Sequence, residues 1–130
     1  MYLLGCDMTA GKLFHYRCTV SRVVDGDTID VDIDLGFNIK YSERVRLLGI
    51  NTPETRTRDL EEKARGLEAK DFVITWLEDM ADNCPIIETK VDKKGKFGRI
   101  LGRVLNDDGE CLNDTLLELG HATAYDGGKR

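Results

Sequence analysis

The order of apolar and polar positions along the chain predicts five β-strands. Residues 14–24 are rich in β-forming side chains, and residues 28–35 alternate strictly between apolar and polar positions. Residues 39–50 form a third strand-like segment, and two more cover residues 86–91 and 97–105. Turn-forming Asp, Gly and Asn residues separate the first three segments. This pattern indicates a protein built mainly from β-structure.

The second predicted strand shows the clearest alternation. One face carries Ile29, Val31, Ile33 and Leu35, and the other carries Thr28, Asp30, Asp32 and Asp34. Strict alternation is typical of a strand with one buried and one solvated face. We therefore interpret the row of aspartates as a solvated strand face and not as a second metal site.

The spacing of apolar residues changes to a helical period after residue 58. Asp59 and Glu62 have the spacing of a capping box, which predicts a helix start. The apolar residues that follow at helical spacing are Leu60, Ala64, Leu67, Ile74 and Leu77, with Phe72, Val73, Trp76 and Met80 widening the face. Asn83 and Pro85 are expected to close this helix.

A second, shorter helix is predicted over residues 112–119, with Leu112, Leu116 and Leu119 on one face and Gly120 as its stop. The predicted order is three strands, a helix, two strands and a helix. This is the order of the OB-fold, a five-stranded, partly open β-barrel. We expect a mainly β (α+β) protein in a single domain over residues 1–130, with a core at about 13–125 and a lead-in at 1–12.

Composition narrows the functional classes. Apolar residues make up 41% and charged residues 33% of the 130 residues, as in globular proteins. No run approaches the roughly 20 apolar residues that cross a bilayer, so we expect no membrane association. The net charge of −5 argues against a non-specific nucleic-acid coat. It leaves room for an enzyme with a local cationic cleft.

The cysteines and the N-terminal sequence indicate the cellular compartment in which the protein is expected. Cys6, Cys18, Cys84 and Cys111 form no Cys-x-x-Cys pair, so their spacing does not favour a zinc site. Cys18 and Cys111 lie in apolar segments and are expected in the core. The Leu-Leu-Gly-Cys sequence at 3–6 lacks the basic and apolar regions of an export signal, which leads us to expect a cytoplasmic protein with free thiols.

Three short segments carry candidate chemistry. Asp-Gly-Asp-Thr at 25–28 is, by itself, an ordinary hairpin turn. Residues 46–54 place an amide, a hydroxyl and a carboxylate at the end of a strand. Taken alone, they are also consistent with a strand that ends at Pro53 and exposes polar side chains to solvent. Residues 93–99 fit a basic hairpin loop. Each segment alone admits a purely structural interpretation.

Together, these segments resemble the active-site segments of the staphylococcal nuclease (thermonuclease) family. The shared sequences are Asp-Gly-Asp-Thr, Arg-Leu-Leu-x-x-Asn-Thr-Pro-Glu-Thr and Lys-Phe-Gly-Arg, in the family's order and separation. The likeness covers roughly residues 15–125 and continues through Leu112, Asn113, Gly120 and Tyr125. It implies an endonuclease that hydrolyses phosphodiester bonds of DNA and RNA and leaves 3′-phosphate ends.

The resemblance also implies a role for individual residues. The implied catalytic residues are Arg46, Glu54 and Arg99: the arginines bind phosphate and Glu54 acts on the attacking water. The implied metal ligands are Asp27, Asn51 and the backbone carbonyl of Thr52, with Asp25 orienting them from outside the metal's own shell. The implied substrate-binding residues are Lys96, Phe97 and Tyr125.

These residue types suit the chemistry. Phosphodiester hydrolysis adds negative charge to the phosphoryl oxygens, which forked guanidiniums and a divalent cation stabilise. Carboxylate, amide and carbonyl oxygens favour a hard cation, so the implied cofactor is Ca²⁺, with Mg²⁺ and Mn²⁺ as alternatives. The implied partner is DNA or RNA, preferably single-stranded, bound by a monomer.

The chain departs from the family's secreted members in several ways. Asn51 stands where they carry aspartate, so one ligand charge is missing, and Phe97 stands where they carry tyrosine. Their further C-terminal helix has no counterpart before Arg130. These features, with the expected lack of an export signal, suggest an intracellular or phage-encoded relative. The alternative function is a catalytically silent OB-fold module that binds nucleic acid or protein. The retention of the carboxylates and arginines argues against this alternative.

Overall fold

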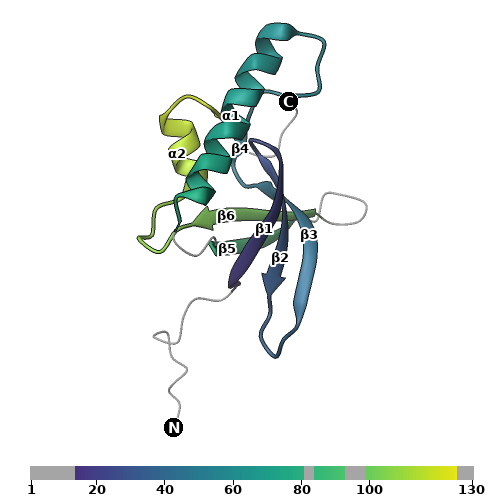
Figure 1. Cartoon of the computed structure of the whole chain (residues 1–130), viewed down its shortest axis with the longest axis vertical. Helices are drawn as coiled ribbons and strands as arrows, with labels where there is room; N and C mark the ends of the chain where they lie inside the picture. Colours follow the sequence, from purple (N-terminus) through teal and green to yellow (C-terminus); the bar gives the residue numbers. More distant parts are fainter. Residues whose placement is uncertain (1–13, 81–83, 93–98, 126–130) are drawn as a thin grey trace.

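A computed structural model of the chain describes residues 14–80, 84–92 and 99–125. Five strands close into a barrel in the order β1–β2–β3–β6–β5 (Figure 1). Their bounds are β1 His15–Asp25, β2 Thr28–Asp34, β3 Lys40–Leu47, β5 Ile86–Asp92 and β6 Arg99–Leu105. Neighbouring strands are antiparallel except β3 and β6, which run parallel. The predicted five-stranded OB-type barrel is confirmed.

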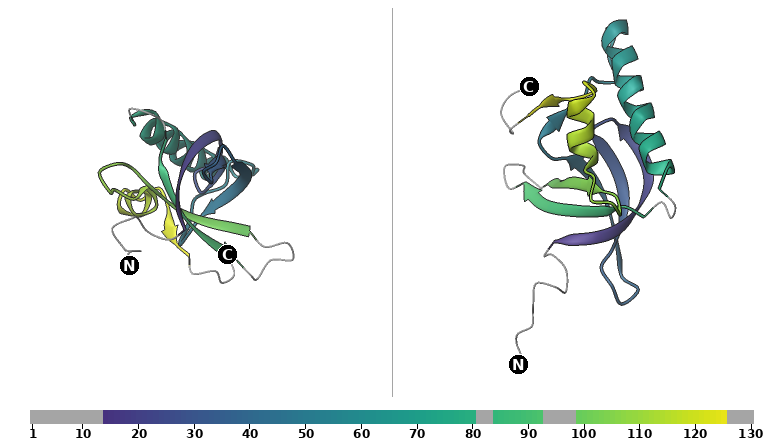
Figure 2. Two further views of the ribbon diagram at one scale, coloured as in Figure 1. Left: turned by 90° about the horizontal axis from the view of Figure 1, so that it is seen from below. Right: turned by 90° about the vertical axis from the view of Figure 1, so that its left-hand side faces the viewer.

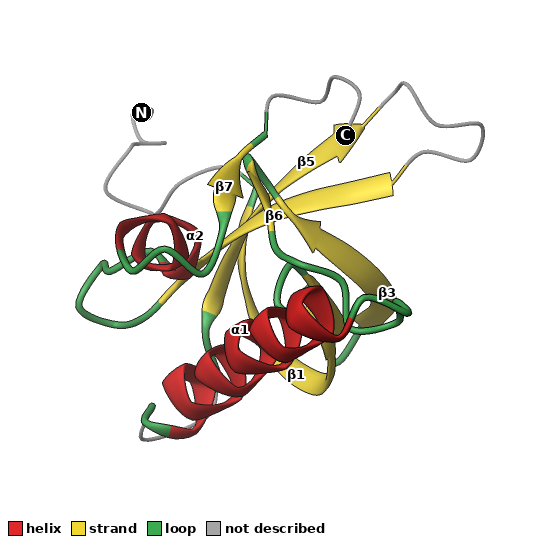
Figure 3. Cartoon of the chain, turned by 90° about the horizontal axis from the view of Figure 1, so that it is seen from above, coloured by secondary structure: helices red, strands yellow, loops and turns green. Residues whose placement is uncertain are grey.

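Two helices and a small two-stranded sheet complete the described part of the chain. Helix α1 (Leu60–Glu78) lies across one end of the barrel with α2 (Leu112–Glu118) beside it (Figures 2 and 3). The short strands β4 (Ile50–Asn51) and β7 (Thr123–Ala124) pair with each other. Neither described helix combines the length and the apolar character needed to cross a membrane.

The third predicted strand is interrupted, which corrects its expected extent. Strand β3 stops at Leu47, and a turn follows at Gly49, whose φ of +84° favours glycine. The chain then forms β4, which leaves the barrel and pairs with β7. The turn therefore redirects the residues after β3 away from the barrel sheet and toward the C-terminal part of the chain.

The barrel interior follows the predicted alternation. Ile29, Val31 and Ile33 are buried together with Cys18, and Cys111 is buried at the start of α2. Leu35, predicted on the same face, is 45% exposed because β2 ends at Asp34 and the chain turns outward. The core is therefore set by the alternating positions of the strands themselves.

The aspartates on the outer face of β2 are paired with polar residues of β3. Arg44 Nε donates a hydrogen bond to Asp30 at 2.8 Å, and Ser42 donates to Asp32. The hydrogen bond from Arg44 lowers the pKa of the Asp30 carboxyl. The interpretation of this row as a solvated strand face is confirmed.

The buried face of α1 agrees with the predicted one at Val73 and Leu77 and differs from it in the first half of the helix. Leu60 is 79% exposed and Leu67 is 43% exposed, although both were expected to face the core. The buried positions are Gly66, Ala69, Val73 and Leu77, and Phe72 and Trp76 pack at the edge of the core. The helix presents its smallest residues where it meets the loops at the end of the barrel. Leu119 is likewise 58% exposed, beyond the end of α2.

The burial of Cys18 leads to a prediction about thiol reactivity. Burial raises the pKa of the Cys18 thiol to about 12, and the nearby Cys84 adds to the effect. At pH 8 we expect iodoacetamide to modify Cys18 at least about a hundredfold more slowly in the folded protein than in urea. Peptide mapping by mass spectrometry measures this, with the partly exposed Cys84 as the internal comparison. Equal rates at Cys18 in both states would contradict the burial argument.

Candidate active site

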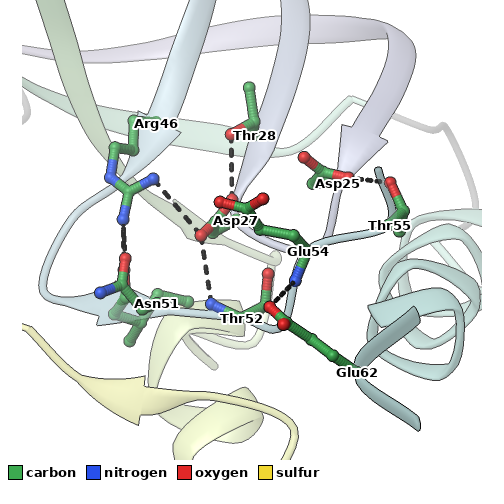
Figure 4. Close-up of polar contacts among 10 residues, drawn as sticks. Asp25, Asp27, Thr28, Arg46, Asn51, Thr52, Glu54, Thr55 and Glu62 are labelled. Carbon is green, nitrogen blue, oxygen red and sulfur yellow. Dashed lines mark hydrogen bonds and ion pairs between the residues drawn. The ribbon is translucent and has the colours of Figure 1, made fainter. Parts of the chain in front are cut away.

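Asp27 lies at the centre of a polar cluster at the end of the barrel next to α1 (Figure 4). It lies in the β1–β2 turn and is 4% exposed. Its Oδ1 accepts a hydrogen bond from the Thr28 hydroxyl at 3.0 Å, and its Oδ2 accepts one from the Thr52 backbone N–H at 3.1 Å. Arg46 Nη1 lies 3.3 Å from the same Oδ2. The buried carboxylate is thus held by neutral donors and one cation.

The turn that carries Asp27 depends on a glycine. A Cβ atom on Gly26 would lie 2.8 Å from Ala69 Cβ and 2.9 Å from Thr52 Cγ2. These distances are too short for real Cβ contacts, so a side chain at this position would push the turn away from α1 and from Thr52. The Asp-Gly-Asp sequence therefore allows close approach as well as a turn.

Arg46 reaches the cluster from the end of β3. It pairs in register with Thr28 of β2, and its side chain is 14% exposed. Its Nη2 donates hydrogen bonds to Asn51 Oδ1 and, at 3.3 Å, to the Ile50 carbonyl. The guanidinium carbon lies 5.3 Å from the centre of the Tyr125 ring, within cation–π range. The N–H groups of the guanidinium group and one of its faces are thereby held by the fold.

Strand β7 brings Tyr125 to this position. Asn51 pairs with Thr123 in the β4–β7 sheet, and the Tyr125 N–H donates a hydrogen bond to the Gly49 carbonyl at 2.8 Å. Segments far apart in the sequence thus meet beside Arg46. The proximity of Tyr125 to Arg46 agrees with the pocket position implied by the resemblance, and its contact with a nucleotide stays a prediction.

The oxygen donors fit a hard cation. Asp27 Oδ2 and Asn51 Oδ1 both contact the Arg46 guanidinium, so a carboxylate and an amide oxygen converge on one centre of positive charge. Thr52, whose carbonyl is the third implied ligand, is buried next to them. The described residues contain no cluster of three or more His, Cys, Asp or Glu side chains. A cation here would therefore rely on amide and carbonyl oxygens in addition to one carboxylate.

Glu54 lies on the loop between β4 and α1 and is exposed. Figure 4 shows its side chain pointing from this loop toward the side of the cluster where Asp27 lies. Its backbone N–H donates a hydrogen bond to Glu62 Oε2 at 3.2 Å. The next residue, Thr55, donates its hydroxyl to Asp25 Oδ1. Asp25 therefore anchors the loop of Glu54 to the end of β1, and the orienting role that the resemblance implied for Asp25 stays a prediction.

The third predicted segment is only partly visible. Arg99 begins β6 and pairs in register with Asp92, and its side chain lies outside the described part of the structure. Lys96 and Phe97 lie outside the described residues. The roles of these three residues stay predictions.

Sequence reasoning missed the residues that hold the loop of Glu54. Glu62 was assigned to a capping box, yet its carboxylate contacts the Glu54 N–H. Gly66 and Thr55 received no role, although Gly66 packs against this loop and Thr55, within the loop, binds Asp25. The close sequence position of Glu62 to the motif was the available signal, and only the three-dimensional structure shows which backbone N–H it binds.

The chain resembles several known proteins. The family model described as staphylococcal nuclease homologue matches residues 44–130. The thermonuclease of Staphylococcus intermedius is 36% identical over 105 residues, which cover 81% of this chain and 57% of the relative. The endonuclease YhcR of Bacillus subtilis is 30% identical over 115 residues, which cover 85% of this chain and 9% of the relative. The chain thus spans less than two thirds of the length of either relative.

Proposed function

Because the chain belongs to the staphylococcal nuclease family, we propose that it is an endonuclease that hydrolyses phosphodiester bonds of DNA and RNA. The observation that carries this proposal is the convergence of Asp27, Arg46 and Asn51 beside the loop of Glu54. The relatives named thermonuclease and endonuclease support the same activity.

The proposed reaction uses the exposed carboxylate and the forked guanidinium. Glu54 takes a proton from a water molecule whose oxygen attacks the phosphorus atom. Arg46 stabilises the negative charge that develops on the phosphoryl oxygens, together with Arg99 by family resemblance. The bond from phosphorus to the 5′ oxygen breaks, and that oxygen takes a proton from solvent. The products are a 3′-phosphate and a 5′-hydroxyl.

The proposed cofactor is Ca²⁺, with Mg²⁺ and Mn²⁺ as alternatives, held by Asp27, Asn51 and the Thr52 carbonyl. A bound divalent cation neutralises charge on the phosphate and lowers the barrier to attack. Arg46 already contacts Asp27 and Asn51, so this chain balances the ligand oxygens with its own positive charge. The donor set agrees with a hard cation, and its single carboxylate favours weak binding by the protein alone.

The proposed substrate is single-stranded nucleic acid, bound by a monomer in the cytoplasm of the producing cell or, for a phage protein, of its host. Tyr125 beside Arg46 offers a ring against which a base can stack while the guanidinium binds the adjoining phosphate. Stacking of this kind requires an unpaired base, which duplex DNA does not present.

Cleavage of a labelled single-stranded oligonucleotide tests the proposal. Fragments are expected with Ca²⁺ and not with chelator, and phosphatase treatment should be needed before their 3′ ends can be extended. Fragments that form equally in chelator would contradict metal dependence. Binding without cleavage under Ca²⁺, Mg²⁺ and Mn²⁺ would instead indicate the silent binding module.

The forked geometry of the Arg46 guanidinium group should matter more for activity than its positive charge. Lysine cannot contact Asp27 and Asn51 together or present a flat face to Tyr125. We expect Arg46→Lys to lower kcat/KM by about 10²–10³ in steady-state cleavage assays. Arg44→Lys is the matched control and should retain activity, because Arg44 lies two residues earlier on β3 and forms its ion pair with Asp30, away from Asp27. Full activity of Arg46→Lys would reduce the role of this residue to charge attraction.

Asn51 should limit metal affinity. Asn51→Asp adds a second anionic oxygen to the ligand set, and we expect calorimetry to show Ca²⁺ binding at least about tenfold tighter. A non-cleavable nucleotide should tighten Ca²⁺ binding in the wild type, because its phosphate supplies the missing charge. Asn38→Asp in the β2–β3 turn adds the same charge far from the site and serves as the control. If neither Asn51→Asp nor nucleotide changes the affinity, the cation is bound elsewhere.

A further inference from the structure

We propose that helix α1 positions the catalytic loop, with Glu62 as the residue that fixes the backbone of Glu54 and Gly66 as the residue that lets the loop pack against the helix. This inference rests on the proposed nuclease function for its effect on rate. Glu62 and Gly66 are positioning residues, because both contact the loop backbone and not the reacting groups.

Glu62 is available for this role because another residue caps the helix. Asp59 Oδ1 accepts hydrogen bonds from the backbone N–H groups of Glu61 and Glu62 at 3.0 and 3.3 Å. In a reciprocal capping box, Glu62 would return to the Asp59 N–H. That N–H instead donates to the Thr57 hydroxyl, and the half-buried Glu62 carboxylate accepts from the Glu54 N–H at 3.2 Å.

This hydrogen bond acts at the base of the reactive side chain. The Glu54 N–H is bonded to the same Cα atom that carries the Glu54 side chain. A hydrogen bond to an ionised carboxylate is stronger than one between neutral groups. Glu62 therefore restrains the point from which the exposed Glu54 carboxylate extends toward the cluster, while leaving the carboxylate itself accessible to water.

Gly66 lies one turn further along the same side of α1. A Cβ atom at this position would lie 2.7 Å from the Pro53 carbonyl oxygen and 2.8 Å from the Glu54 carbonyl oxygen. Both are backbone atoms, so any larger residue must displace the loop or the helix. The loop of Glu54 thus rests directly on the helix backbone, next to the hydrogen bond made by Glu62.

The same side of α1 also contacts the turn that carries Asp27. Ala69 lies 2.8 Å from the position of a Cβ on Gly26. One rigid helix therefore sets the relative positions of the Asp27 turn and the Glu54 loop. This arrangement explains why Gly66 and Ala69, and not the leucines Leu60 and Leu67, face the barrel.

The test compares Glu62→Ala with Glu62→Gln in cleavage of a single-stranded oligonucleotide. We expect Glu62→Ala to lower kcat by about tenfold to a hundredfold, since small displacements of a catalytic group cost rates of this size. KM should stay within about twofold, because the phosphate-binding residues are untouched. Glu62→Gln keeps an acceptor oxygen and should restore most of kcat. Glu61→Ala removes an acidic residue from the same helical turn and should leave kcat unchanged.

A second measurement follows the hydrogen bond without using activity. Exchange of the Glu54 backbone amide, observed by NMR, should be at least about tenfold faster in Glu62→Ala than in the wild type, Glu62→Gln or Glu61→Ala. If the wild type cleaves no nucleic acid, the proposed function fails while amide exchange still reports on the restraint. Gly66→Ala should displace the loop and lower kcat without removing Glu62.

Three results would overturn the inference. Unchanged kcat and amide exchange in Glu62→Ala would show that the hydrogen bond does not restrain the loop. An equal loss of kcat in Glu61→Ala would indicate a general effect of charge at the helix start. A loss in Glu62→Gln as large as in Glu62→Ala would show that the negative charge, and not the position of Glu54, is what matters.

Discussion

Asp27→Asn is expected to lower metal-dependent cleavage by at least about a hundredfold while the barrel stays folded. The amide can keep an oxygen toward the Thr52 N–H and donate its own N–H to the Thr28 hydroxyl, so the buried hydrogen bonds survive. The negative charge beside Arg46 is lost, and with it the only carboxylate among the proposed metal ligands. Cleavage rates, Ca²⁺ titration and thermal unfolding of the same preparation measure these effects.

Alanine at this position would be a less informative variant. The Thr52 N–H and the Arg46 guanidinium would lose an acceptor in a site that is almost fully buried, and an unsatisfied buried group costs about 1–3 kcal/mol. Loss of activity in Asp27→Ala therefore combines the missing ligand with reduced stability. Activity close to that of the wild type in Asp27→Asn, with unchanged Ca²⁺ affinity, would refute the metal assignment.

Glu54→Gln is expected to lower kcat by about 10²–10⁴ and to change KM little. The side chain is exposed and its backbone N–H still reaches Glu62, so neither stability nor the loop position should change. The substitution removes the carboxylate that takes the proton from water. Steady-state kinetics with an oligonucleotide separate kcat from KM.

The control for Glu54→Gln is Glu118→Gln, which makes the same chemical change at an exposed position of α2. It should behave as the wild type in both constants. A Glu54→Gln variant with normal kcat and raised KM would identify Glu54 as a binding group. The proposed general base would then have to be another residue.

The barrel could be predicted because its strand segments show their own pattern of apolar and polar residues. Ile29, Val31 and Ile33 alternate with aspartates, and the same alternation decides which side chains fill the interior. The motif residues Asp27, Arg46 and Asn51 also proved to be neighbours in space, as the family resemblance implied. The alternating strand segments, and the proximity of these three motif residues, were therefore predicted correctly from sequence.

Other features depend on contacts that no local pattern records. A two-residue strand such as β4 is too short to show a period, and its pairing with β7 depends on a segment far along the chain. The face of α1 was misassigned because hydrophobicity favoured Leu60 and Leu67, while space near the site required Gly66 and Ala69. The position of the loop of Glu54 decided the orientation of the helix.

The pairing of β4 with β7 has an effect during synthesis. A nascent chain leaves the ribosome N-terminus first, at about 5–20 residues per second. All five barrel strands precede Thr123 and Ala124 in the sequence, so β4 can pair with β7 only after the last barrel strand has been made. Arg46 therefore gains its aromatic neighbour Tyr125 only after the barrel strands have been made. Assembly of the proposed nuclease site therefore depends on the segment that carries β7 and Tyr125.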